Sequence, residues 1–230
     1  MAFRLCVLLL LCGLWLVLPA ADPVTIMPLG DSITQGNKTQ DSYRRPLFHK
    51  LKDAGYSFRF VGSEKSNFTG APPHPDFQQD NEGHYGWKIT DVLPKLDGWL
   101  GQNNPDIVLL HLGTNDNGQP NRTPDAILAD IESMIDIMRK HNPKVKVLLA
   151  QLMTNWGDLV EVNRRIPELA KRKSTAASPI IVVDQVTGFD IRKGQDTVDG
   201  CHPNPAGEEK MAAKWFAALV SVLPKPPGAH

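Results

Sequence analysis

Two kinds of apolar spacing alternate along this chain, and they predict strands and helices that follow one another in turn. Short continuous apolar runs, typical of buried strands, occupy residues 24–29, 58–61, 107–112, 145–150 and 180–183. Apolar positions at helical spacing occupy residues 43–54, 89–100, 123–140, 158–172 and 205–223. This order predicts a three-layer α/β/α sandwich built on about five parallel strands.

Two long segments, residues 62–86 and 187–203, show neither spacing. The first is rich in Gly, Pro, Asn, Asp and His and is long for a mere connection, which predicts a loop that lines a site. Pro94 interrupts one helical segment and predicts a kink or a restart there. Because no repeat or linker divides the chain, we expect residues 22–230 to form one domain.

The first 21 residues have the pattern of a targeting signal. Arg4 precedes a short apolar stretch, residues 5–18, which ends in small residues before a polar segment. The stretch is short for a membrane span, and no Lys/Arg cluster follows it. We therefore expect residues 1–21 to be a signal peptide and the mature protein to be secreted, extracellular and free of the membrane.

Removal of that signal leaves Cys201 as the one cysteine of the mature chain, so no internal disulfide is expected. Three glycosylation sequons begin at Asn37, Asn67 and Asn121, and the sequence leaves open whether any of them is used.

The charge balance excludes some classes of partner. Lys and Arg number 25 and so do Asp and Glu, so no net field would draw the protein to nucleic acid or anionic lipid. His74 and His84 lack neighbours at metal-ligand spacing, and neither a phosphate-binding glycine loop nor a Gly-x-Ser-x-Gly motif occurs. We expect a monomer that binds no metal and no nucleic acid.

Three polar clusters follow strands of the predicted sheet. Gly30-Asp31-Ser32 follows the first apolar run, Gly113-Thr114-Asn115-Asp116 follows the third, and a polar loop follows the last. The carboxyl ends of parallel strands lie at one edge of a sheet, which is where such folds place their functional cleft. Taken alone, Gly-Asp-Ser is also an ordinary turn and helix cap.

The last of these loops supplies the groups that a serine nucleophile needs. Asp199 precedes His202 by three residues across a glycine turn, so its carboxylate can accept the imidazole Nδ1–H. Together with Ser32 this gives a nucleophile, a base and an orienting carboxylate in the order Ser, Asp, His. Alone, Asp-x-x-His is as often a simple turn.

A nucleophilic serine also needs donors for the developing oxyanion. The Ser32 backbone N–H is one candidate, and the side-chain amide of Asn115 is another. Asn115 has the alternative interpretation of a capping residue in a Gly-Thr-Asn-Asp turn.

These motifs together resemble a known family. Gly-Asp-Ser-Ile-Thr, Gly-Thr-Asn-Asp and Asp-Gly-Cys-His-Pro-Asn are similar, in this order, to blocks I, III and V of the GDSL/SGNH hydrolases. The resemblance implies a flavodoxin-like fold and a serine esterase mechanism without metal or organic cofactor. It implies that Ser32 is the nucleophile and first oxyanion donor, Asn115 the side-chain donor, His202 the base and Asp199 its partner.

The resemblance also implies a glycine that donates its N–H to the oxyanion. In Glu-Gly-His-Tyr-Gly-Trp-Lys-Ile, Gly86 matches that glycine best, and Gly83 is the second choice. This motif resembles most the acetyl-xylan esterase branch, carbohydrate esterase family 3. Cys201 stands where that pattern has an aliphatic residue, and we expect it to pack as a small apolar side chain.

The resemblance leads to the hypothesis of a secreted esterase that removes acetyl groups from a polysaccharide or oligosaccharide such as acetylated xylan. A lipase, lysophospholipase or thioesterase of the same superfamily is the first alternative, and a non-catalytic carbohydrate-binding protein is the second. Trp87 and Trp156 could stack on sugar or pack in the core, and His74 and His84 could touch substrate from the long loop.

Overall fold

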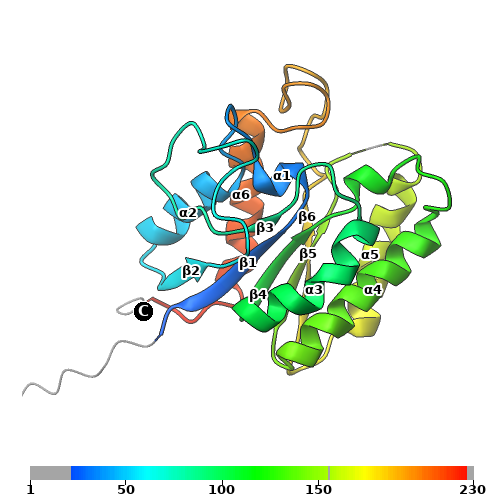
Figure 1. Ribbon diagram of the computed structural model, residues 1–230, viewed down its shortest axis with the longest axis horizontal. Helices are drawn as coiled ribbons and strands as arrows, with labels where there is room; N and C mark the ends of the chain where they lie inside the picture. Colours follow the sequence, from blue (N-terminus) through cyan, green and yellow to red (C-terminus); the bar gives the residue numbers. More distant parts are fainter. Residues whose placement is uncertain (1–21, 155, 227–230) are drawn as a thin grey trace, which may run out of the picture.

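The computed structural model of the chain describes residues 22–154 and 156–226 (Figure 1). The predicted signal peptide, residues 1–21, therefore lies outside the described residues. Within the described ranges, no helix combines the length and the apolar content that a membrane span requires.

A parallel sheet forms the centre of the molecule (Figure 1), with the strand order β2-β1-β4-β5-β6. The strands are β1 (Val24–Gly30), β2 (Phe58–Phe60), β3 (Glu82–Gly83), β4 (Ile107–His111), β5 (Lys146–Gln151) and β6 (Ile180–Asp184). The short strand β3 pairs with Leu29 and Gly30 at the carboxyl end of β1. The prediction missed β3 because two residues are too few to show a hydrophobic period.

Helices cover both faces of this sheet. They are α1 (Ser32–Gln35), α2 (Arg44–Asp53), α3 (Ile89–Asn103), α4 (Pro124–His141), α5 (Leu159–Lys173) and α6 (Pro205–Val220), with a 3₁₀ turn η1 (Thr114–Asp116). The ends of α4 and α6 follow their sequence signals, because Thr123 and Asn204 cap the first turns and proline takes the first position. A restart at Pro94 is wrong, since α3 is one helix across that residue.

The two faces of the sheet bury separate cores. Alternate residues of β4 divide between them, with Val108 and Leu110 in one core and Ile107 and Leu109 in the other. Helices α3, α4 and α5 cover the first face, and α2 and α6 cover the second (Figure 1). Burial on both faces explains why the strand segments are continuously apolar rather than alternating. The predicted three-layer α/β/α sandwich is confirmed.

The strand order also determines where a cleft can form. From β1 the chain crosses to β2 on one side and later to β4 on the other, which is the switch point of a flavodoxin-like sheet. Ligand crevices in such sheets lie beyond the carboxyl ends of the two strands at this point. Ser32 follows β1 directly and Asn115 follows β4 closely, so both lie at the switch point.

Helix α1 is too short to satisfy its own backbone, and residues 42–44 complete its hydrogen bonding. The Ser42 hydroxyl lies 3.1 Å from the Ile33 carbonyl oxygen and 2.8 Å from that of Thr34. Arg44 donates from Nε to the Thr34 carbonyl at 2.8 Å and from Nη2 to that of Gln35 at 2.7 Å. The last three carbonyls of the helix that begins with Ser32 therefore depend on two side chains from outside it.

The guanidinium of Arg44 is fully buried, and protein oxygens surround it. Besides α1 it donates to the carbonyl of Gln79 and to the side chain of Asn67, and its charge lies 5.4 Å above the centre of the Phe77 ring. Burial lowers the pKa of Arg44 to about 10, so the side chain is still charged at neutral pH. A buried charge is tolerated only with such partners.

Helix α6 is connected to the same segment through Glu208. Ser42 has a φ of 73°, which is strained for a residue with a side chain, and its N–H donates to Glu208 Oε1 at 2.9 Å. Glu208 lies in the first turn of α6 and is buried, and burial raises the pKa of its carboxyl to about 7. Helix α1 is thus connected to both α2 and α6.

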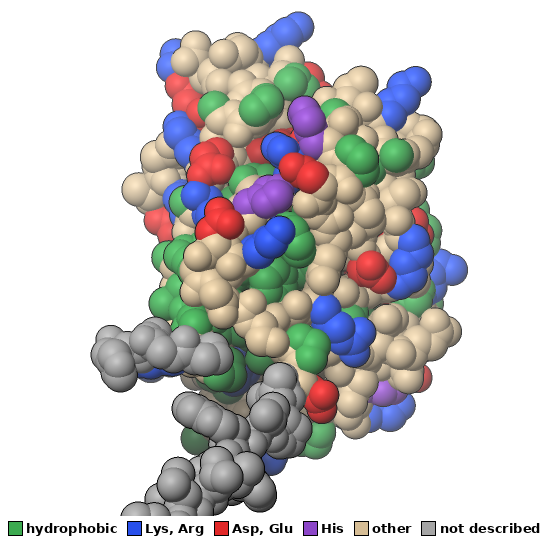
Figure 2. Space-filling view, turned by 90° about the vertical axis from the view of Figure 1, so that its left-hand side faces the viewer, with side chains coloured by type: hydrophobic (Ala, Val, Ile, Leu, Met, Phe, Trp, Pro, Cys, Tyr) green, Lys and Arg blue, Asp and Glu red, His purple; other side chains and the backbone are tan. Residues whose placement is uncertain are grey.

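Acidic and basic side chains intermingle on the face shown in Figure 2. This matches the equal numbers of the two charge types in the sequence.

We expect Arg44→Met to lower the free energy of unfolding by about 3 kcal/mol or more, because several buried carbonyls lose their donor. Urea denaturation measures the loss. The neighbouring Arg45 is a matched control, because its side chain is 32% exposed and pairs with Asp76 at the surface. Arg45→Met should cost under about 1 kcal/mol, and equal losses in the two variants would contradict the assignment.

We expect the wild-type protein to lose stability as the pH rises from 4.5 to about 7, and we expect Glu208→Gln to abolish this loss. Over this range the unfolded carboxyl is ionised while the folded one still holds its proton, so raising the pH favours unfolding, by up to ~3 kcal/mol. Denaturation at pH 5 and at pH 7.5 measures the free energy of unfolding of both proteins. The wild-type value minus the variant value should be smaller at pH 7.5 than at pH 5. A difference that stays constant or rises would refute a raised pKa at Glu208.

Candidate active site

Ser32 lies where β1 passes into α1, close to the neighbouring strand. A side chain at Gly30 would come within 2.4 Å of the His111 carbonyl oxygen, so only glycine allows this approach of β1 to β4. Asp31 then caps α1 by accepting the Ile33 N–H at 3.0 Å. The Gly-Asp-Ser sequence is therefore a helix cap, and the same cap presents Ser32.

The structure brings Ser32, His202 and Asp199 together although 170 positions separate the first two. Ser32 Oγ lies 3.0 Å from His202 Nε2, and His202 Nδ1 lies 2.7 Å from Asp199 Oδ2. A carboxylate at Nδ1 holds the proton on that nitrogen, which leaves Nε2 free to accept the serine proton. The three predicted residues therefore have the geometry of a nucleophile, a base and an orienting acid.

Asp199 is ionised over the neutral range. Burial opposes its ionisation, but hydrogen bonds from the His202 side chain and from the backbone N–H groups of His202 and Cys201 outweigh it and lower the pKa of Asp199. The two N–H groups reach Asp199 Oδ1 at 2.8 and 2.9 Å. Gly200 lies in the turn that brings these N–H groups back to Asp199, and its φ of 95° is one that glycine adopts readily.

Cys201, the departure from the family pattern, is half-buried and packs against the core that α2 and α6 cover. Burial raises the pKa of its thiol to about 12. It is therefore a neutral apolar side chain here, as expected.

Of the two candidate glycines, Gly86 has the available N–H. It lies in a turn with a φ of 79° and is exposed, and none of the described residues accepts a hydrogen bond from its N–H. Gly83 belongs to β3, and its N–H already donates to Asn81 Oδ1 at 2.9 Å. The geometry thus favours Gly86 over Gly83 as an oxyanion donor.

Asn115 is held against the segment that carries Gly86. Its Nδ2 donates one hydrogen to the Trp87 carbonyl at 2.9 Å, and the amide has a second hydrogen to give. The next residue, Asp116, accepts the Ile89 N–H at 3.1 Å and the Arg122 Nε–H at 2.6 Å. These bonds fix the turn η1 relative to the start of α3, and so fix the two candidate donors relative to each other.

Tyr85 and Phe68 also reach the site, and the sequence did not single them out. The Tyr85 ring is stacked on His202, with the ring centres 5.6 Å apart and the planes at 12°. Phe68 is stacked on Tyr85, at 4.3 Å and 18°. The predicted site-lining loop, residues 62–86, thus does reach the site. Its lack of periodicity was the available signal, but it could not name these two side chains.

His84 and Trp87 point inward instead. His84 is 7% exposed, bonds to the buried Glu82 and stacks between Trp87 and Trp99 at 4.4 and 4.5 Å. Trp87 packs against the core that α3 covers. The suggestions that His84 touches substrate and that Trp87 stacks on sugar are therefore not supported.

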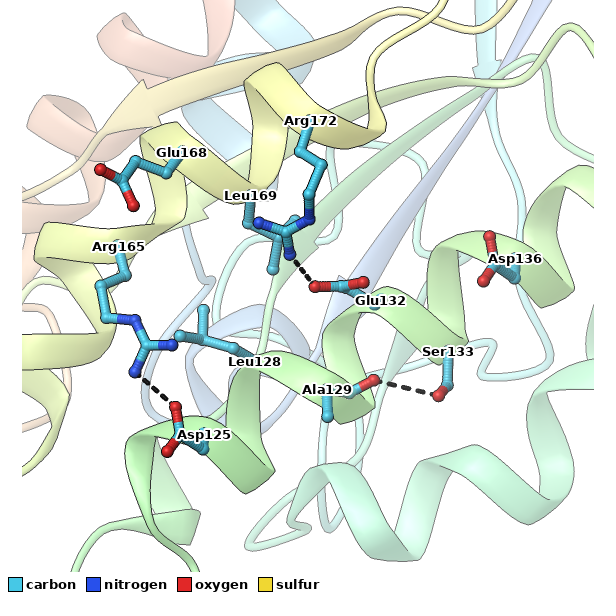
Figure 3. A pocket seen from close by; sticks show the side chains of 10 residues that line it. All are labelled: Asp125, Leu128, Ala129, Glu132, Ser133, Asp136, Arg165, Glu168, Leu169 and Arg172. Atoms are coloured by element: carbon cyan, nitrogen blue, oxygen red, sulfur yellow. Dashed lines mark hydrogen bonds and ion pairs between the residues drawn. The ribbon is translucent and has the colours of Figure 1, made fainter.

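A small cavity of about 10 Å³ adjoins the catalytic pair, lined in part by Ser32, Gly36, His202 and Glu208. A hollow of about 320 Å³ lies elsewhere, between α4 and α5 (Figure 3), where the ion pairs Arg165–Asp125 and Arg172–Glu132 connect the two helices. Its one hydroxyl group, that of Ser133, donates to the Ala129 carbonyl of α4 and has no hydrogen bond to a histidine or carboxylate among the described residues. The candidate site at Ser32 is therefore identified by its hydrogen-bonded side chains and not by the volume of its cavity.

Among the described residues, no three His, Cys, Asp or Glu side chains converge as a metal site requires.

Comparison with known proteins agrees with this reading. Residues 29–210 match the GDSL-like Lipase/Acylhydrolase family. A multidomain esterase of Ruminococcus flavefaciens is 31% identical over 236 positions, which cover 89% of this chain but 29% of that protein. The chain thus spans under a third of that relative.

Two solved structures are similar over nearly their full length. A carbohydrate esterase family 3 protein from Talaromyces cellulolyticus has a TM-score of 0.77 and 32% identity, covering 86% of this chain and 97% of that one. A family 3 carbohydrate esterase from Clostridium thermocellum has a TM-score of 0.74 and 30% identity, covering 87% and 97%. The resemblance that the motifs indicated is confirmed, and this chain belongs to the GDSL-like Lipase/Acylhydrolase family of ester-hydrolysing enzymes.

Proposed function

We propose that this protein is a secreted serine esterase that removes acetyl groups from carbohydrate. The observation that carries the proposal is the hydrogen-bonded series Ser32–His202–Asp199, with distances of 3.0 and 2.7 Å, beside the available N–H of Gly86. Such a series converts a weakly nucleophilic hydroxyl into one that can attack an ester carbonyl.

In the first half of the reaction, Ser32 Oγ attacks the carbonyl carbon of the acetyl ester while His202 Nε2 takes its proton. Asp199 stabilises the imidazolium that forms. The carbonyl oxygen becomes an oxyanion, which we expect the N–H groups of Ser32 and Gly86 and the amide of Asn115 to bind. His202 then returns the proton to the sugar oxygen as the bond to it breaks, leaving an acetyl group on Ser32.

In the second half, a water molecule replaces the sugar. His202 Nε2 takes a proton from this water as it attacks the acetyl carbonyl, and the same donors bind the second oxyanion. Collapse of that intermediate returns the proton to Ser32 Oγ and releases acetate. The cycle needs only the side chains and backbone groups already described.

Two observations support a short acyl group and a sugar. The cavity beside Ser32 and His202 is about 10 Å³, which is too small for a long acyl chain. The similar structures from Talaromyces cellulolyticus and Clostridium thermocellum are carbohydrate esterases. Secretion is supported by the pattern of residues 1–21.

We expect Ser32→Ala to lower acetate release from acetylated xylan by about 10⁴-fold or more, since the nucleophile is lost. The melting temperature should stay near that of the wild type. Ser133→Ala is the matched control, because that serine only donates to the Ala129 carbonyl on α4. Undiminished turnover in Ser32→Ala would exclude the proposed mechanism.

We expect Asn115→Ala to lower kcat by about 10²- to 10³-fold with little change in KM, because the oxyanion loses a donor that acts in the transition state. Initial rates on a soluble acetyl ester measure both constants. Asn117→Ala, two residues along the same turn, should leave kcat near the wild-type value. Equal effects of the two substitutions would mean that Asn115 serves only to shape the turn.

A further inference from the structure

Among the large hydrophobic side chains that the described part of the chain exposes, Phe68 is the one aromatic residue, and it is 42% exposed. The others are valines at positions 160, 186, 198 and 220. Phe68 is also distinguished by its place, since it ends a series of three stacked rings that begins at His202 and passes through Tyr85. Single exposed hydrophobic residues such as these valines are ordinary on a protein surface, but Phe68 differs from them because it is stacked in series with the proposed catalytic base.

The backbone beneath Phe68 is firmly held. Its N–H donates to the Gly36 carbonyl at 3.2 Å, directly after the nucleophile helix. The preceding residue, Asn67, is 3% exposed, donates to the Gln40 carbonyl at 2.8 Å and accepts from Arg44. The exposed ring therefore stands on an anchored segment, which reduces the entropy lost when a ligand binds to it.

Tyr85 is fixed from its own side. Its N–H donates to Gln35 Oε1 at 2.9 Å, and Gln35 is the last residue of α1. The backbone N–H groups of Tyr85 and Phe68 are thus both hydrogen-bonded to residues at the end of the helix that begins with Ser32. Their position relative to the nucleophile is set by backbone bonds rather than by ring contacts alone.

The direction of the series identifies which part of the substrate it meets. His202 returns its proton to the leaving oxygen, and we infer that the rings stacked on His202 extend along the sugar side of the scissile bond. Phe68 is separated from His202 by a whole ring, with stacking distances of 4.3 and 5.6 Å. It is therefore too far out to hold the sugar that carries the acetyl group, and within reach of the next sugar in the chain.

We propose that Phe68, backed by Tyr85, is a stacking subsite for the sugar unit next to the acetylated one, so that the preferred substrate is an acetylated oligosaccharide or polysaccharide. This rests on the proposed carbohydrate esterase function. The C–H groups on one face of a pyranose ring form a flat apolar surface, which suits an uncharged aromatic ring. Phe68 thereby determines chain-length specificity without taking part in the chemistry.

The test compares two substrates that carry the same acetyl group, acetylated xylotriose and acetylated methyl xyloside, which has a single sugar ring. We expect Phe68→Ala to raise KM for the trisaccharide by about tenfold with kcat unchanged, and to leave the single-ring substrate unaffected. Phe68→Trp should restore the trisaccharide KM. Val220→Ala is the matched control, because Val220 is equally exposed, at 42%, and lies at the end of α6.

Equal effects of Phe68→Ala on the two substrates, or no effect on either, would overturn the subsite while leaving the esterase function in place. A series of p-nitrophenyl esters of increasing acyl length tests whether Phe68 contacts an acyl chain instead of a sugar. If Phe68→Ala lowers activity only on the longer acyl esters, the ring contacts an acyl chain and the subsite is wrong. Wild-type protein that releases no acetate from either sugar substrate would instead overturn the carbohydrate esterase function, and the subsite with it.

Discussion

A one-turn helix cannot satisfy its own backbone, and Ser32, the proposed nucleophile, stands at the start of such a helix. With four residues, α1 leaves the carbonyls of Ile33, Thr34 and Gln35 without partners in the helix. The buried guanidinium of Arg44 and the hydroxyl of Ser42 supply those partners. Helix α2 carries Arg44, and Glu208 of α6 fixes Ser42. The position of Ser32 therefore depends on the layer formed by helices α2 and α6.

The other half of the site is built differently. His202 and Asp199 belong to a loop whose geometry comes from a glycine turn and from N–H groups that converge on the Asp199 carboxylate. The candidate oxyanion donors Gly86 and Asn115 come from two further segments, which the Asn115–Trp87 bond joins directly. Four separate pieces of chain thus meet at one point, and each is fixed by its own short-range bonds. Such preorganised donors cost no reorganisation when charge develops.

Much of the fold could be predicted because it follows from periodicity. Strands buried on both faces are continuously apolar, and the helices carry an apolar stripe, so the order of elements was visible in the sequence. The polar residues after β1, β4 and β6 could be found for a related reason, since parallel strands bring their carboxyl ends to one edge. Short elements such as β3 and α1 have no period, and the sequence did not reveal them.

The details of the site could not be predicted as well from the sequence, because they depend on which hydrogen-bond or stacking partner each side chain has in the folded protein. Gly86 matches the family pattern better than Gly83, but the sequence could not show that the Gly83 N–H is already bonded to Asn81. Arg44 and Arg45 are adjacent arginines on one helix, yet the helix turns the first into the core and the second to Asp76 at the surface. Phe68 could not be identified because its role arises from ring contacts across the fold.

The burial of Asn67 has a consequence for glycosylation of the chain. Its amide begins a glycosylation sequon, but the same amide is 3% exposed and bonds to Gln40 and Arg44 beneath the nucleophile helix. A glycan attached there would remove those bonds and would have no path to solvent, whereas Asn121 lies exposed in a surface turn. If the chain is glycosylated before it folds, only molecules in which Asn67 stays unmodified can therefore form these bonds.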